Sequence, residues 1–177
     1  MGVAFGRTFL GALALITITV AKRISLPRER KMWGHLWVVA MLLNVIPGVL
    51  FAVAETKVTS ILAGIMNAVT PLMTLLVMIT LFREDKPRVY QVVGLSIGFF
   101  GVLTVLGIWH GLGANSIPAI LALLVAVTCY GFSFPYSRRY VLPYKLRPEA
   151  LATTQVSLAA LTLLPFFIFH GVSKEEW

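Results

Sequence analysis

The chain has 177 residues, of which 58% are hydrophobic and 12% charged, and its formal net charge is +8. A soluble domain is typically about 45–50% apolar and about 25% charged, so this apolar excess cannot be buried in one soluble core, and lipid is the expected solvent. The basic residues lie between apolar runs rather than on a face with stacking aromatics, which argues against a nucleic-acid partner.

Six apolar runs are long enough to cross a bilayer as helices. The hydrocarbon core is about 30 Å thick and requires around 20 apolar residues per helix. Short connections between such helices make antiparallel neighbours, so the sequence predicts an all-α, polytopic membrane bundle. In chain order the runs are 2–21, 33–54, 58–82, 88–108, 116–137 and 148–170.

The first run carries a charged residue, Arg7, inside the predicted span. A charge at this depth either snorkels to the interface or points into an aqueous vestibule. In the second case Arg7 would attract or orient an anionic group such as a carboxylate. Both interpretations stay open.

The second run places Asn44, Pro47 and Gly48 near its middle. The third run contains "GIMNAVTPLMTLL", in which Asn67, Thr70 and Thr74 recur at spacings of three and four and share one helix face. Its proline, Pro71, has no backbone N–H, and proline usually kinks a helix.

Two neighbouring helices with an asparagine shortly before a proline suggest paired discontinuities around one site. The polar groups then line a cavity in the substrate path. The alternative is that they act as interhelical glue, with asparagine and threonine bonded to a neighbouring helix.

The later runs carry weaker signals. Gly94, Gly98 and Gly101 form a small-residue ridge in the fourth run, which predicts close helix packing. Tyr130 and Ser133 in the fifth run are further candidates for polar walls of the path. We find no serine-hydrolase, zinc-protease or phosphate-loop motif, and we expect neither catalysis nor a metal or cofactor.

The distribution of Lys and Arg predicts the orientation of the spans. Loops one, three and five hold twelve of these residues, whereas the other side holds Lys57 and Lys174. The basic loops are therefore expected in the cytoplasm and both termini outside. That topology suggests that a helix preceding residue 1 is absent from this chain. Residues 152–163 also align with residues 4–15, as in an inverted repeat.

The order of these motifs resembles the EamA domain of the drug/metabolite transporter superfamily. The pattern is an Asn/Thr–Pro helix, then "LFRED", a short basic loop and "GLSIGFFGV"; "VAFGRTFLGALAL" resembles the second helix of that domain. The resemblance implies a ten-helix, inverted-repeat fold, of which this chain corresponds to helices two to seven. The implied domains are 1–108 (repeat one), a linker 109–115, and 116–177 (the start of repeat two).

The resemblance also implies a function. The chain would be part of an inner-membrane carrier that exports small metabolites, such as amino acids or drugs, by alternating access without ATP. Its partners would be a small-molecule substrate and the bilayer. Two alternatives stay open, a truncated membrane remnant that transports nothing, and a half-size carrier that associates with a second copy of itself.

Overall fold

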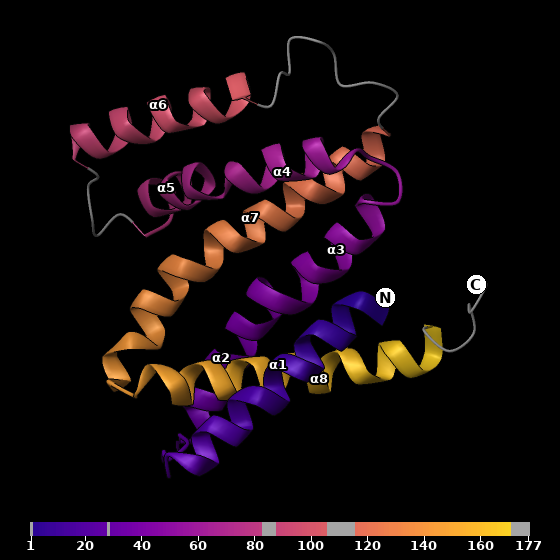
Figure 1. Ribbon diagram of the computed structural model, residues 1–177. Helices are drawn as coiled ribbons and strands as arrows, with labels where there is room; N and C mark the ends of the chain where they lie inside the picture. The colour runs from indigo at the N-terminus through magenta and orange to yellow at the C-terminus, as the bar shows by residue number, and fades with distance from the viewer. Residues whose placement is uncertain (1, 28, 83–87, 106–115, 171–177) are drawn as a thin grey trace. The chain divides into compact units, whose positions relative to one another are not determined.

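The computed structural model describes residues 2–27, 29–82, 88–105 and 116–170. Throughout these ranges the regular structure is helical, which confirms the prediction of an all-α fold. The chain groups into two compact units, which are treated separately below. Unit 1 comprises the described residues of 1–49 and 136–177, and unit 2 comprises those of 50–135 (Figure 1).

Each of the six predicted runs corresponds to one helix or to a series of consecutive helices. The second and third runs are divided, as described below. Residues 83–85 of the "LFRED" motif and the predicted linker 109–115 lie outside the described residues. The elements are α1 (Gly2–Ala21), α2 (Arg30–Ala40), η1 (Met41–Val45), α3 (Ile46–Ala54), α4 (Ser60–Ala68), α5 (Thr70–Thr80), α6 (Val89–Val105), α7 (Ile117–Tyr140), η3 (Leu142–Tyr144) and α8 (Pro148–His170).

Among the described residues, three helical stretches have the length and composition needed to cross a membrane. They are Arg30–Ala54, Ser60–Thr80 and Ile117–Tyr144. Phe5–Ala21 and Val89–Gly101 are shorter apolar helices within the described part of the chain. These lengths agree with a polytopic membrane protein, whereas the number of spans stays a prediction.

Unit 1 is organised around α8. Helix α1 packs along α8, and α2 and η1 also contact it (Figure 1). Small residues such as Ala159 and Ala160 are buried on α8, so neighbouring helices can approach closely. Two apolar clusters result. One joins Met32, Leu36, Val39 and Val141, and the other joins Ala40, Val45, Ala159 and Leu163.

Polar side chains also join α1 to α8 inside unit 1. The hydroxyls of Thr19 and Thr153 are buried and lie 2.6 Å apart, and Thr153 also donates to the carbonyl of Glu149 at 2.7 Å. Such interhelical bonds contribute about 0.6 kcal/mol on average in membrane proteins. The pair therefore adds a modest stabilisation to the packing of α1 on α8.

Unit 2 has its own apolar cluster. Ala54, Ala63, Ala119 and Leu123 are buried together, with Phe51 and Met66 packed against them. Helix α6 contacts α4 and α5. The cluster thus joins the end of α3 and the start of α4 to the first half of α7.

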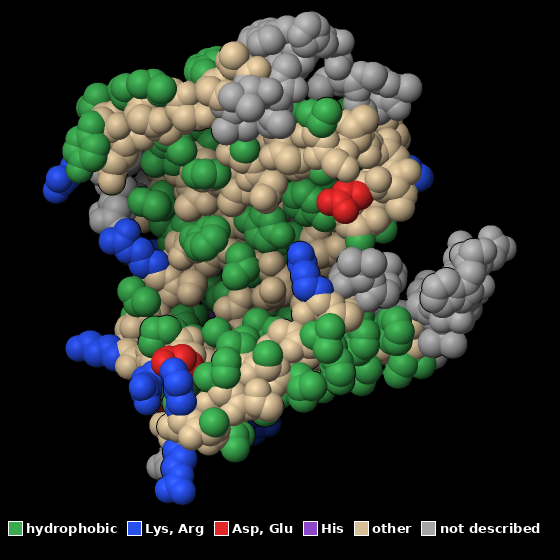
Figure 2. Space-filling view, viewed as in Figure 1, with side chains coloured by type: hydrophobic (Ala, Val, Ile, Leu, Met, Phe, Trp, Pro, Cys, Tyr) green, Lys and Arg blue, Asp and Glu red, His purple; other side chains and the backbone are tan. Residues whose placement is uncertain are grey.

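Large apolar side chains are exposed on both units. Examples are Leu10 on unit 1 and Ile97 on unit 2, which are 66% and 67% exposed. Figure 2 shows hydrophobic side chains spread over the visible surface of each unit. Soluble proteins avoid large contiguous apolar patches, so these surfaces fit a lipid environment.

Candidate functional site

The helix that carries Asn44 is interrupted in unit 1. Helix α2 passes into the π-helix η1 over Met41–Val45, and the N–H of Ile46 donates to the carbonyl of Met41, five residues earlier. Pro47 follows within the first turn of α3 and supplies no N–H to the preceding turn. π-Helical turns of this kind frequently mark functional sites. The discontinuity lies where the Asn–Pro pair predicts it.

The side chain of Asn44 has an unusual environment at this discontinuity. Its Nδ2 atom is buried and has no hydrogen-bond partner among the described residues. Pro47 and Gly48 beside it are also buried. An unpartnered buried amide costs about 1–3 kcal/mol, and such groups are rare in folded proteins. Asn44 therefore holds a hydrogen-bond donor that the fold leaves unused.

The third run is interrupted in a different manner, in unit 2. Helix α4 ends at Ala68, and α5 begins at Thr70 with a proline, Pro71, in its first turn. Val69 between them donates its N–H to the carbonyl of Met66 at 3.1 Å and accepts from the N–H of Met73 at 3.0 Å. The break keeps part of the helical hydrogen bonding, which suits a backbone surrounded by lipid.

The third run was predicted to carry a polar stripe, formed by Asn67, Thr70 and Thr74 with Pro71. Only part of this stripe is available for binding. The hydroxyl of Thr74 donates to the carbonyl of Thr70 at 2.9 Å and is satisfied within its own helix. The hydroxyl of Thr70 is buried and has no partner among the described residues. Asn67 and Pro71 are exposed. Thr70 is therefore the member of this stripe with an unused buried polar atom.

The two candidates on α7 are held differently. Ser133 is buried, and its hydroxyl donates to the carbonyl of Tyr130 at 2.8 Å. Tyr130 is half-buried, and its ring lies 6.2 Å from that of Phe51. Ser133 thus satisfies its hydroxyl locally, and its role in lining a path stays a prediction.

Gly131 on α7, which the sequence analysis did not select, lies close to the backbone of α5. A Cβ atom added there would lie 3.0 Å from the carbonyl carbon of Met73 and 3.1 Å from its oxygen. Real Cβ atoms rarely approach backbone this closely, so α7 meets the backbone of α5 at this glycine. A lone glycine within the apolar run 116–137 was the available signal.

The glycine ridge of α6 was predicted to pack closely against another helix. A Cβ added at Gly94, Gly98 or Gly101 would meet nothing within 4 Å. These three positions are exposed, so the ridge makes no close helix contact within the described part of the chain. No described helix packs on this ridge, so the prediction that another helix approaches it closely stays a prediction.

The remaining candidates can be placed in their own units. Arg7 is exposed on α1 of unit 1, the unit that also holds Asn44 and Pro47. Asn67, Thr70, Pro71, Thr74, Tyr130 and Ser133 belong to unit 2. Within the described residues no group of three or more histidine, cysteine, aspartate or glutamate side chains is arranged to hold a metal ion.

Comparison with known proteins places the chain in a family. Residues 1–107 match the sequence model of the EamA-like transporter family, which is more than half of the 177 residues. Comparisons with curated proteins and with solved structures gave no match. The helical fold, the exposed apolar surfaces and the interrupted helices agree with the family match. The chain therefore belongs to the EamA-like transporter family and is a multi-pass membrane protein of the drug/metabolite transporter superfamily.

Proposed function

We propose that this chain is a carrier component that exports small polar metabolites, such as amino acids or drugs, across the inner membrane. Three buried side-chain polar atoms have no hydrogen-bond partner among the described residues, and two of them, Asn44 Nδ2 and Thr70 Oγ1, carry this proposal; the third is Ser157 Oγ. Asn44 and Thr70 each lie at a helix discontinuity. In hydrocarbon an unsatisfied polar group costs several kcal/mol, so water or substrate is the partner that would offset the cost.

The proposed binding chemistry is uncharged hydrogen bonding. The amide of Asn44 donates to a carbonyl or carboxylate oxygen, while the hydroxyl of Thr70 donates or accepts. Asn67, Pro47, Pro71 and Thr74 complete the proposed borders of the path, and Arg7 would attract anionic substrates toward it. The distribution of Lys and Arg supports an orientation with the basic loops in the cytoplasm. The inner-membrane location is part of the proposal.

The proposed mechanism is alternating access without ATP. Irregular backbone at membrane depth is tolerated where it borders protein or a water-filled cavity, and transporters place such broken helices at their binding sites. The π-helix η1 and the break at Val69 are the two points where the described helices depart from regular geometry within predicted spans. We propose that each of these points lines a polar path in its own unit, and that the helix bends there when the carrier changes the side of the membrane to which it is open.

Replacing Thr70 with valine tests the proposal in unit 2. Valine keeps the shape and removes the hydroxyl, and we expect exchange of substrate to fall about threefold to tenfold, as for one lost hydrogen bond. The measurement is counterflow of radiolabelled amino acids and of the dye ethidium in proteoliposomes containing the full chain.

The matched control is Thr80→Val on the same helix. The hydroxyl of Thr80 already donates to the carbonyl of Leu76 at 2.8 Å and is exposed, so its loss should leave counterflow unchanged. Asn67→Leu provides a second test of the path. Unaltered counterflow in both Thr70→Val and Asn67→Leu, with transport by the parent chain established, would contradict the assignment of this stripe.

A further inference from the structure

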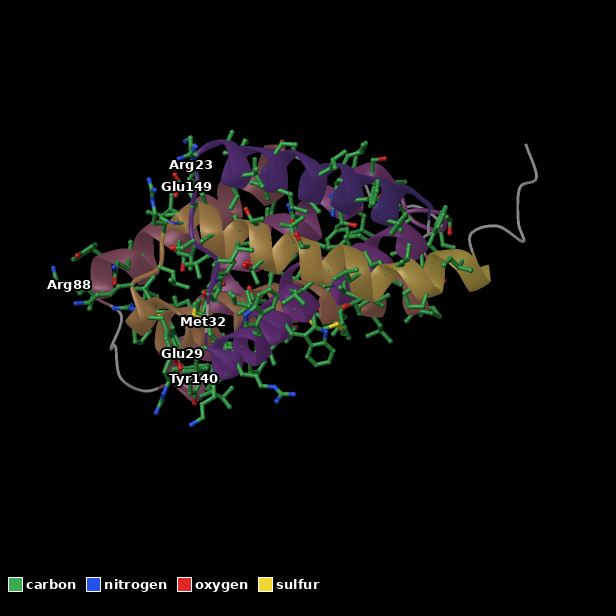
Figure 3. All side chains as sticks on the ribbon, turned by 90° about the horizontal axis from the view of Figure 1, so that it is seen from below. Arg23, Glu29, Met32, Arg88, Tyr140 and Glu149 are labelled. Atoms are coloured by element: carbon green, nitrogen blue, oxygen red, sulfur yellow. The ribbon has the colours of Figure 1, made fainter. Side chains whose placement is uncertain are left out.

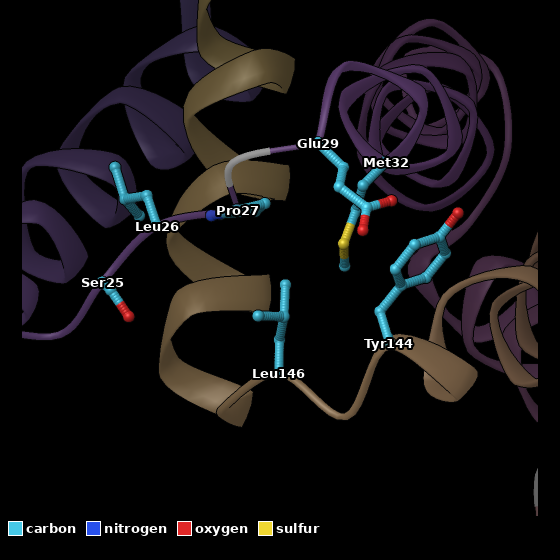
Figure 4. Close-up of a pocket in the computed structure, with 7 residues that line it drawn as sticks. All are labelled: Ser25, Leu26, Pro27, Glu29, Met32, Tyr144 and Leu146. Atoms are coloured by element: carbon cyan, nitrogen blue, oxygen red, sulfur yellow. The ribbon is translucent and has the colours of Figure 1, made fainter.

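A cavity of about 440 Å³ lies at one end of unit 1. Its walls come from the linker between α1 and α2 and from the segment between α7 and α8. This volume falls within the range of about 300–1,000 Å³ that is usual for small-molecule sites. Figure 4 shows the lining residues, which are Ser25, Leu26, Pro27, Glu29, Met32, Tyr144 and Leu146.

The two walls are held by local bonds and by an ion-pair bridge. Trp33 donates its indole N–H to the carbonyl of Pro27 at 3.0 Å. Glu149 lies 3.9 Å from the amine of Lys22 on the first linker and 4.0 Å from the guanidinium of Arg147 on the second. The apolar floor is continuous with the buried cluster that contains Met32. These contacts connect the two segments that line the cavity.

The carboxylate of Glu29 is available to a ligand. Glu29 occupies the N-cap position of α2, yet its side chain makes no capping hydrogen bond, and no ion pair joins it to another described residue. Figure 4 shows this carboxylate, the thioether of Met32 and the ring of Tyr144 on one side of the cavity, with Leu26 and Leu146 on the other. The cavity thus combines one anionic group, one aromatic ring and an apolar wall.

Four basic residues are next to lining residues of this cavity in the sequence. Arg30 and Lys31 follow Glu29, and Lys145 and Arg147 flank Leu146; all four are exposed. Figure 2 shows Lys and Arg side chains gathered at this end of unit 1. Figure 3 shows Glu29 and Met32 at the same end of the unit as Arg23 and Glu149. A purely anionic ligand would be attracted by the basic residues but repelled by the carboxylate of Glu29.

We propose that the cavity binds the head group of an amine-bearing phospholipid, of the phosphatidylethanolamine type. The ammonium group lies against Glu29 and the ring of Tyr144, which together offer a salt bridge and a cation–π surface. The phosphate faces the flanking lysine and arginine side chains, and the glycerol end lies on Leu26 and Leu146. A zwitterionic head group carries a positive charge for Glu29 and a negative charge for the basic residues. Because the cavity is predicted to lie at the membrane interface, the acyl chains of the bound lipid can stay in the bilayer.

The test uses the purified full chain in detergent with equal amounts of phosphatidylethanolamine, phosphatidylglycerol and phosphatidylcholine. Native mass spectrometry measures which lipid stays bound. We expect preferential retention of phosphatidylethanolamine, and we expect Glu29→Gln to reduce it about tenfold, as for the loss of a charge-assisted bond. Glutamine is nearly isosteric, and Glu29 forms no capping bond whose loss would affect folding.

The matched control is Glu55→Gln, an exposed glutamate remote from this cavity in the sequence, which should leave retention unchanged. Photo-crosslinking of the unaltered chain with a photoactivatable phosphatidylethanolamine provides an independent readout. Crosslinks are expected in residues 25–32 and 144–147. Equal retention by Glu29→Gln, preference for phosphatidylglycerol, or crosslinks confined to other segments would overturn the proposal.

Discussion

Replacing Gly131 with leucine is expected to lower the free energy of unfolding by about 3 kcal/mol or more, because overpacking a tight contact costs typically 1–3 kcal/mol and the obstacle here is backbone. The first added carbon would lie 3.0 Å from the carbonyl carbon of Met73, so α7 and α5 would have to separate. The measurement is thermal unfolding of the purified chain in detergent micelles, followed by far-ultraviolet circular dichroism.

Two glycines provide controls for this substitution. A Cβ at Gly11 would meet Val156 at 3.7 Å, an ordinary contact, and a Cβ at Gly98 would meet nothing within 4 Å. We therefore expect Gly11→Ala to be tolerated and Gly98→Leu to leave unfolding unchanged. If Gly131→Leu unfolds at the same temperature as the parent chain, the close contact between α5 and α7 does not exist.

Replacing Asn44 with leucine is expected to lower transport without lowering the stability of the protein. The buried Nδ2 atom has no partner among the described residues, so its removal sacrifices no intramolecular hydrogen bond. Stability should stay unchanged or rise by up to about 1 kcal/mol, because a desolvated amide is lost. Counterflow should fall about tenfold, the ratio that corresponds to a hydrogen bond of about 1.4 kcal/mol to the substrate or to water in the path.

Two further variants test whether the amide donor of Asn44 or the shape of its side chain is responsible for the effect. Asn44→Gln keeps an amide donor and should retain more counterflow than Asn44→Leu. Thr17→Val removes an exposed hydroxyl that already bonds to the carbonyl of Ala14, and it should affect neither quantity. A large loss of stability in Asn44→Leu would indicate that the amide is a structural group, and it would contradict the proposed role.

The helices were largely predictable from the sequence. Long apolar runs separated by short polar loops define where a lipid-exposed backbone must be helical, and six such runs correspond to the observed segments. The interruptions were predictable as well, because Pro47 and Pro71 remove backbone donors. Their forms were not, since a π-helix in one case and a break in the other depend on how the surrounding turns recover their hydrogen bonds.

The sequence does not show which individual polar groups have a hydrogen-bond partner. Thr70 and Thr74 share a helix face, yet Thr74 bonds to its own backbone and Thr70 does not. The hydroxyl of Ser133, like that of Thr74, donates to a backbone carbonyl of its own helix. The importance of Gly131 depends on which helix lies opposite it, whereas Gly98 shows that a glycine ridge can face open space. These outcomes depend on tertiary contacts between segments far apart in the chain.

The cavity next to Glu29 was hidden from sequence analysis for a related reason. Its lining comes from two linkers that are far apart in the sequence, and each linker alone resembles an ordinary basic loop. Charge patterning predicts the orientation of the spans, but it does not reveal that Glu29 forms no ion pair with another described residue. The side-chain arrangement was needed to identify that group.

The most direct measurement of the central claim is the reaction of introduced cysteines with a membrane-impermeant methanethiosulfonate. The chain has one cysteine, so Cys129→Ala provides a background without thiols. We predict that Asn44→Cys and Thr70→Cys, each made in that background, react in intact membranes, whereas Leu76→Cys, an exposed apolar position on α5, does not. If the cysteines at positions 44 and 70 are as unreactive as the one at position 76, water does not reach the helix discontinuities, and the carrier account is contradicted.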